Sequence, residues 1–296
     1  MYCHFAFSTT SKGGILLNIL YLVSIVLGVS AQDITRKAFN QKNRGVYLFS
    51  ALAAFFAMAF FAVSAGSMEW NLGLLPYAVA FAASYGLASV CSVIAVATGS
   101  LSITTLVISY SLMLPTLYGL IFLREPIGPG FFPGLILLII SLLLINKRSE
   151  SVPVSPKWII SLLLAFVGNG ACSIVQKMQQ NAFEGAFKNE FMILSLLLVV
   201  IALLAMSFKV ERPEIRPSLK NGWWLCLICG AMNGMVNLFV MILSGRMPVS
   251  IMFPVISAGG IILTSLISML VYHEKLTRQQ LIGLGLGIAT VILLNL

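Results

Sequence analysis

The sequence predicts an all-α polytopic membrane protein, with ten transmembrane helices arranged as two inverted five-helix repeats around a central cavity. Three observations support this fold class: the composition, the number of long apolar runs, and an internal repeat. Of the 296 residues, 59% are hydrophobic and 9% are charged, whereas soluble domains contain about 25% charged residues. Because too few polar side chains remain to cover a surface that faces water, soluble enzymes, disordered chains and disulfide scaffolds are excluded.

Neither the basic residues nor the cysteines indicate a bound group. The formal net charge is +9, but the lysines and arginines lie between apolar runs, so no nucleic acid partner is expected. The number of cysteines, five, is odd, which favours free thiols that pack as small apolar groups. Cys226 and Cys229 have no second pair, whereas a zinc site needs about four ligands. We expect no metal, no cofactor and, because no carboxylate lies deep within a span, no enzyme.

Ten apolar runs have about the length that a bilayer requires, roughly 20 residues for a core about 30 Å thick. The predicted spans are 15–36, 46–65, 72–97, 101–123, 129–146, 158–180, 189–208, 222–244, 249–272 and 279–296. Charged and turn residues separate these runs. Helices fit better than a barrel, since the runs are continuous rather than alternating.

An internal repeat divides the chain into residues 15–147 and 157–296. Four residues of the first half have the same or a similar residue 149 positions later in the second half. The end of span one likewise matches the end of span six at an offset of 140 residues. The pairs are Glu125 and Glu274, Ile127 and Leu276, Gly134 and Gly283, Asn146 and Asn295, and Ile34-Thr35-Arg36-Lys37 with Ile174-Val175-Gln176-Lys177. Because five is an odd number of spans, the second copy is inverted, an arrangement typical of transporters with a site between the repeats.

These features resemble the EamA-type family of the drug/metabolite transporter superfamily. The likeness rests on ten short helices in two halves, a glutamate after spans four and nine followed by glycine about nine residues later, and a lysine that closes spans one and six. The resemblance implies a basket of helices around a central cavity and transport of small metabolites by alternating access. It implies no particular substrate.

Polar residues within the spans are the candidate substrate ligands, because polar groups in lipid are costly and tend to face a cavity. Asn169, Ser173 and Gln176 share one face of span six, and Asn233 and Asn237 share a face of span eight. The predicted substrate-binding residues are Asn169, Ser173, Asn233, Asn237, Tyr85, Tyr110, Ser257, Lys37 and Lys177. Hydrogen bonding between helices is the alternative role for both the hydroxyl and the amide groups. Amides offer donors and an acceptor, which suits a zwitterionic or polyhydroxylated solute.

The charged residues at span ends have simpler interpretations. Asp33 and Lys37 can form an interfacial ion pair, or Lys37 and Lys177 can line the two mouths of a pathway. Asp33 is then the candidate for proton coupling. Glu125 and Glu274 are predicted to fix helix corners by accepting backbone N–H groups at the start of the next span. Without a deep carboxylate, a multidrug proton antiporter is disfavoured.

The sequence therefore predicts a secondary transporter or facilitator, and more specifically an exporter, of a small polar metabolite such as an amino acid. An exporter of drugs or lipid-linked substrates, and a non-transporting membrane scaffold or accessory subunit, are the alternatives. The expected setting is the lipid bilayer of the plasma membrane, as in a bacterial inner membrane, with a small-molecule substrate. The GxxxG spacing of Gly283 and Gly287 indicates contact with span five or with a second subunit in a homodimer. The positive-inside rule places both termini outside, whereas the resemblance implies both inside.

Overall fold

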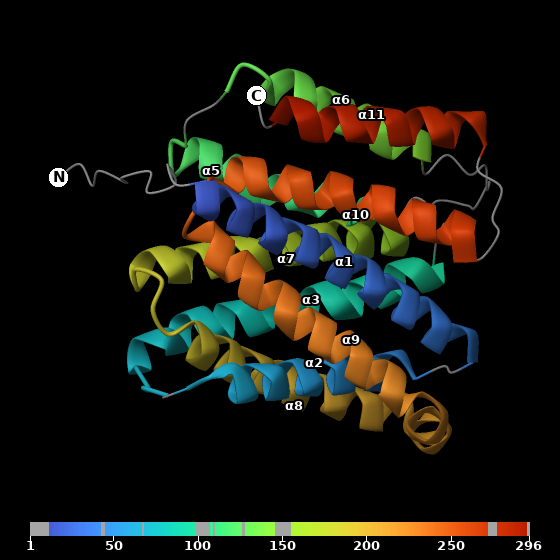
Figure 1. The fold of residues 1–296 in the computed structure, drawn as a ribbon. Helices are drawn as coiled ribbons and strands as arrows, with labels where there is room; N and C mark the ends of the chain where they lie inside the picture. Colours follow the sequence, from blue (N-terminus) through green and yellow to red (C-terminus); the bar gives the residue numbers. More distant parts are fainter. Residues whose placement is uncertain are drawn as a thin grey trace.

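The computed structural model describes residues 12–42, 45–66, 68–98, 107–108, 110–125, 128–145, 155–271 and 277–294. Regular structure within these residues is helical, and no strand occurs among them (Figure 1). The helices are α1 (Lys12–Lys42), α2 (Val46–Ser64), α3 (Leu75–Thr98), α5 (Met113–Ile121), α6 (Phe131–Ile145), α7 (Pro156–Ala182), α8 (Lys188–Val210), α9 (Ile215–Ser244), α10 (Val249–Val271) and α11 (Arg278–Leu294). Short 3-10 turns precede α3 (η1, Leu72–Leu74), α5 (η2, Tyr110–Leu112) and α9 (η3, Arg212–Glu214). Every predicted span thus contains helix, and the expected all-helical class is confirmed.

Six of these helices are long and apolar enough to cross a membrane, and the segments around α5, α6, α10 and α11 are shorter apolar helices. The outer surface is apolar as well. Leu16, Val63 and Ile201 are 69%, 87% and 59% exposed, which would be unfavourable over a whole surface in water but is favourable in lipid. The chain is therefore an integral membrane protein.

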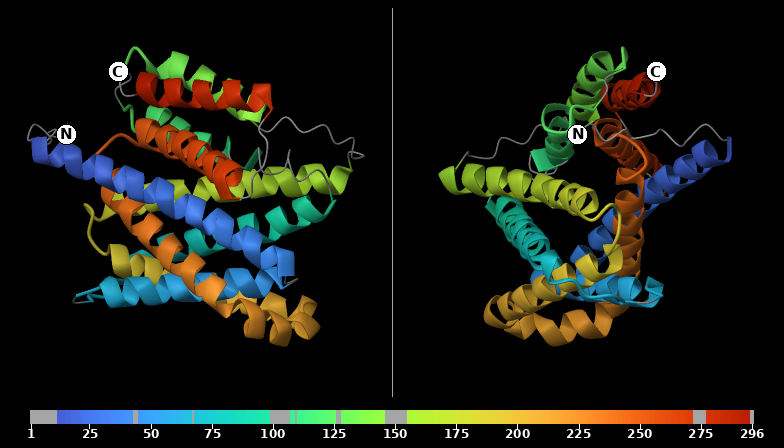
Figure 2. Two further views of the ribbon diagram at one scale, coloured as in Figure 1. Left: turned by 45° about the vertical axis from the view of Figure 1, so that its right-hand side comes forward. Right: turned by 90° about the vertical axis from the view of Figure 1, so that its left-hand side faces the viewer.

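The helices pack in pairs that join the two halves of the sequence. α2 packs on α8 and α9, α3 packs on α7 and α8, and α1 packs on α9 and α10. α6 and α11 pack on each other and on α10, at one side of the molecule (Figure 2). The largest buried cluster lies between α2, α3 and α8 and contains Phe61, Phe81 and Phe191.

Glycines allow the closest approaches between helices. A Cβ atom on Gly28 of α1 would lie 2.6 Å from the side chain of Val236 of α9. A Cβ atom on Gly168 of α7 would lie 2.9 Å from the backbone of Ser84 and of Ala88 in α3. Larger residues at these two positions would force the crossing helices apart.

Helix starts are stabilised by local and by distant oxygen acceptors. Ser155 caps α7, its hydroxyl accepting from the N–H of Trp158, with Pro156 in the first turn. The start of α2 is capped from across the fold, because the carboxylate of Glu211 accepts from the N–H groups of Tyr47 and Leu48 at 3.0 and 3.1 Å. Buried helix ends need such partners, since their first N–H groups have none within the helix.

Candidate functional site

Four amide side chains form a continuous hydrogen-bonded chain between α1, α7 and α9. Gln176 Nε2 donates to Asn237 Oδ1 at 2.7 Å, and Asn237 Nδ2 donates to Asn233 Oδ1 at 3.1 Å. Asn233 Nδ2 in turn donates to Gln32 Oε1 at 2.9 Å. We call Gln32, Asn233, Asn237 and Gln176 the amide chain.

The sequence spacing explains how this chain forms. Asn233 and Asn237 are four residues apart on α9, so their side chains lie on one helix face. The two glutamines at the ends of the chain are buried, whereas both asparagines are only half-buried. The amide chain therefore places polar atoms within an apolar helix bundle, with its two ends buried and its middle partly accessible.

The other predicted substrate ligands lie apart from the amide chain. Asn169 Nδ2 donates to Ser111 Oγ at 2.6 Å, which joins α7 to η2. The hydroxyl of Tyr110 donates to the carbonyl of Ile139 in α6 at 3.0 Å, and Tyr85 stacks on Phe81 within the largest apolar cluster. Ser173 on α7 is half-buried and Ser257 on α10 is buried. The side chains of Asp33, Lys37 and Glu274 lie outside the described residues.

Two charged groups hold the connection between α9 and α10, residues 245–248. Lys177 is 7% exposed, and its Nζ donates to the carbonyl of Ser244, the last residue of α9. Glu125 accepts from the N–H groups of Val249 and Ser250 at 3.0 and 2.8 Å, at the start of α10. A cation at a helix C-terminus and an anion at a helix N-terminus both complement the helix dipole. We call this arrangement the α9–α10 corner.

This corner differs from the sequence expectation in its partners. The carboxylate of Glu125 does accept backbone N–H groups at a helix start, but the helix is α10 and not α6, the helix that follows it in sequence. Lys177 also interacts electrostatically with Glu125, and Arg246 of the connection lies 5.5 Å from the ring centre of Tyr21 on α1. The corner therefore connects α1, α7, α9 and α10 with the segment that follows α5.

Three residues of these networks were not in the predicted ligand set: Gln32, Gln176 and Ser111. Gln176 shares the predicted polar face of span six. Gln32 is a single amide beside the charged end of span one, and Ser111 is one of many hydroxyl residues in span four. The sequence shows that Gln32 and Ser111 are polar, but it does not show that α1 packs on α9 or that η2 packs on α7. Within the described residues, no group of three or more His, Cys, Asp or Glu side chains could hold a metal ion.

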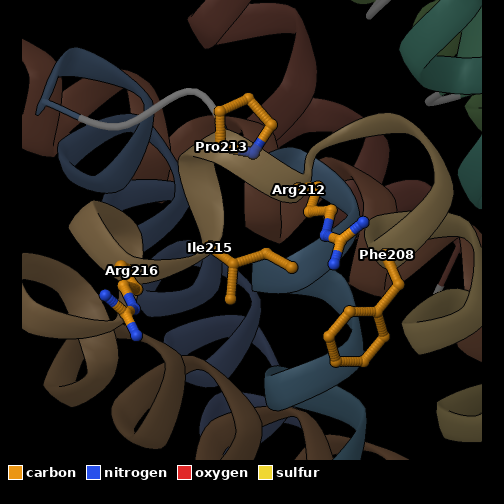
Figure 3. Close-up of a pocket in the computed structure, with 5 residues that line it drawn as sticks. All are labelled: Phe208, Arg212, Pro213, Ile215 and Arg216. Atoms are coloured by element: carbon orange, nitrogen blue, oxygen red, sulfur yellow. The ribbon is translucent and has the colours of Figure 1, made fainter.

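A separate hollow lies where α8 ends and α9 begins (Figure 3). It is lined by Phe208, Arg212, Pro213, Ile215 and Arg216. None of these residues belongs to the amide chain, although Arg216 lies on the same helix, α9, as Asn233 and Asn237. No role was predicted for them from the sequence.

Comparison with known proteins agrees with the expected resemblance. The model of the EamA-like transporter family, part of the drug/metabolite transporter superfamily, matches residues 156–296, so the predicted resemblance is confirmed. A protein of known crystal structure is similar to this chain with a TM-score of 0.76, over 94% of this chain and 96% of that one, at 15% identity. At that identity the likeness shows the fold alone. No curated protein matches the sequence.

Proposed function

From the EamA-like match of residues 156–296, we propose that the chain is a secondary transporter that exports a small polar metabolite, such as an amino acid, across the plasma membrane. The pathway runs between two inverted repeats, residues 15–147 and 157–296, which open alternately to either side. The single observation that supports this most strongly is the amide chain.

The packing of the helices supports the inverted repeat. In the proposed repeat, α1, α2, α3, α5 and α6 correspond to α7, α8, α9, α10 and α11. When each helix is replaced by its counterpart, the packed pair α3–α7 becomes α9–α1, α2–α9 becomes α8–α3, and α1–α10 becomes α7–α5. All six of these pairs are in contact. The pairs α2–α8, α6–α11 and α5–α10 convert into themselves. Gly28 and Gly168 are 140 residues apart, the offset of the sequence repeat, and each allows a close crossing with α9 or α3.

The chemistry of the amide chain supports a polar solute. Each amide carries both donor and acceptor groups, so the chain can bind an ammonium and a carboxylate without a fixed charge of its own. It also joins the two halves, because Gln32 belongs to the first and the other three amides to the second. A solute that replaces one of these hydrogen bonds would loosen the contact between the halves, as alternating access requires.

A binding screen followed by flux tests this proposal. We expect one chemical class among amino acids, sugars, nucleosides and cationic drugs to raise the melting temperature of the purified protein, since ligand at 100 times its Kd stabilises by about 2.7 kcal/mol. In proteoliposomes loaded with that solute, Asn233→Leu is expected to abolish flux while the protein still folds. Asn221→Leu, the same change at an exposed position of α9, is the matched control. Unchanged flux in Asn233→Leu would remove the amide chain from the pathway, and a protein with neither binding nor flux would be a scaffold.

A further inference from the structure

The hollow between α8 and α9 combines positive charge with apolar surface. Figure 3 shows Arg212 and Arg216 on opposite sides of Ile215, with Phe208 next to Arg212. The hollow has a volume of about 580 Å³ and is open on its outer side rather than enclosed. The Phe208 side chain is 60% exposed, so an apolar surface borders the two guanidinium groups.

The two arginines have no ion-pair partner in the part of the chain that the structure describes. The nearest acidic residue in sequence, Glu211, already accepts the backbone N–H groups of Tyr47 and Leu48 at the start of α2. Glu214 is the other acidic residue of this segment, which also contains Lys209 and Lys220, so basic residues outnumber acidic ones by four to two. The hollow is therefore electropositive and suited to an anion.

Tryptophans locate the hollow relative to the bilayer. Trp223 and Trp224 of α9 are 52% and 49% exposed, and exposed tryptophans concentrate where the hydrocarbon meets the headgroups. Arg216 precedes Trp223 by seven residues, about 10 Å along a helix that rises 1.5 Å per residue. The hollow therefore lies at the same end of α9 as these tryptophans, near the membrane edge.

We propose that this hollow binds the headgroup of an anionic phospholipid. The guanidinium groups of Arg212 and Arg216 bind its phosphate oxygens, for which their planar donor geometry is well suited. One acyl chain then lies along Phe208 and Ile215 toward the hydrocarbon core. Basic hollows at the membrane edge are common binding places for such headgroups. The proposal is independent of the solute that the protein carries.

Native mass spectrometry of the detergent-purified protein tests the site. With phosphatidylglycerol we expect bound-lipid peaks that the double variant R212Q/R216Q weakens at least tenfold, and with phosphatidylcholine we expect only weak peaks in both proteins. The matched control K157Q/R278Q removes two exposed basic residues at other helix starts and is expected to bind phosphatidylglycerol like the unchanged protein. The variant R212K/R216K keeps both positive charges but loses the planar guanidinium groups, and it is expected to bind phosphatidylglycerol with intermediate affinity.

Three results would overturn the proposal. Equal binding by R212Q/R216Q and the unchanged protein would show that the arginines are not the site. An equal loss in K157Q/R278Q would show a diffuse charge effect. Displacement of the lipid by inorganic phosphate at the same concentration would indicate a site for a soluble anion. A melting temperature of R212Q/R216Q without lipid that equals that of the control establishes that both variants are folded.

Discussion

The amide chain and the α9–α10 corner are neighbours, yet they accommodate polar groups in opposite ways. Asn237 and Ser244 are seven residues apart on α9, about 10 Å, and Gln176 and Lys177 are adjacent on α7. In the amide chain, neutral side chains bond to one another and two stay half-buried. In the corner, charged side chains bond to backbone groups at helix ends. We therefore expect substitutions in the corner to reduce stability, and substitutions in the amide chain to reduce transport.

The largest loss of stability is expected for Glu125→Gln. The new amide keeps one acceptor oxygen but turns an NH₂ group toward the second N–H of α10, so two donors face each other. Loss of a hydrogen bond to a charged group together with an unpaired buried donor costs about 3 kcal/mol. Thermal melts in detergent measure this loss, with exposed Glu184→Gln as control. A variant that melts like the unchanged protein but binds solute more weakly would move Glu125 from the corner into the substrate site.

Lys177→Met is expected to cost somewhat less, about 2 kcal/mol, because it removes one charge-assisted bond and leaves the Ser244 carbonyl without this donor. The exposed Lys157→Met is the matched control. Because Lys177 and Glu125 interact electrostatically, the loss in the double variant should be smaller than the sum of the single losses. Strictly additive losses would mean that the two charges act on separate helix ends without a shared corner.

The sequence was informative about segments and much less so about their partners. Apolar runs located every helix, because the bilayer fixes their length and composition. The backbone-accepting role of Glu125 followed from its position at a turn, but its contact with Val249, 124 residues away, depends on which helices pack together. The same limit explains Gln32: a lone amide in an apolar span becomes noteworthy only when α9 brings Asn233 to it.

In contrast to the corner, Asn237→Leu is expected to separate transport from stability. The leucine removes the bond from Gln176 and the two bonds of Asn237 Nδ2 to the side chain and the carbonyl of Asn233. The carbonyl keeps its partner within the helix, and the one bond that crosses between helices is worth about 0.6 kcal/mol. We expect a loss of about 1 kcal/mol in a thermal melt and at least a tenfold loss of flux in proteoliposomes. A loss of stability as large as that of Glu125→Gln, with flux retained, would show that the amide chain is a structural contact.

Ser141→Ala should have the smallest effect and provides the baseline for the comparison. Ser141 donates to the carbonyl of Gly283 at 2.6 Å, and a Cβ atom on Gly287 would lie 3.1 Å from its hydroxyl oxygen. The GxxxG glycines of α11 thus contact α6 of the same chain, as one of the two sequence alternatives predicted. Removal of this single bond is expected to lower the free energy of unfolding by about 0.6 kcal/mol without a change in flux. Ser84→Ala is the matched control and should lower it less, because the Ser84 hydroxyl bonds within its own helix. If Ser141→Ala instead dissociated a dimer in size-exclusion chromatography, the glycine face would also contribute to a subunit interface, because α6 and α11 lie together at one side of the molecule.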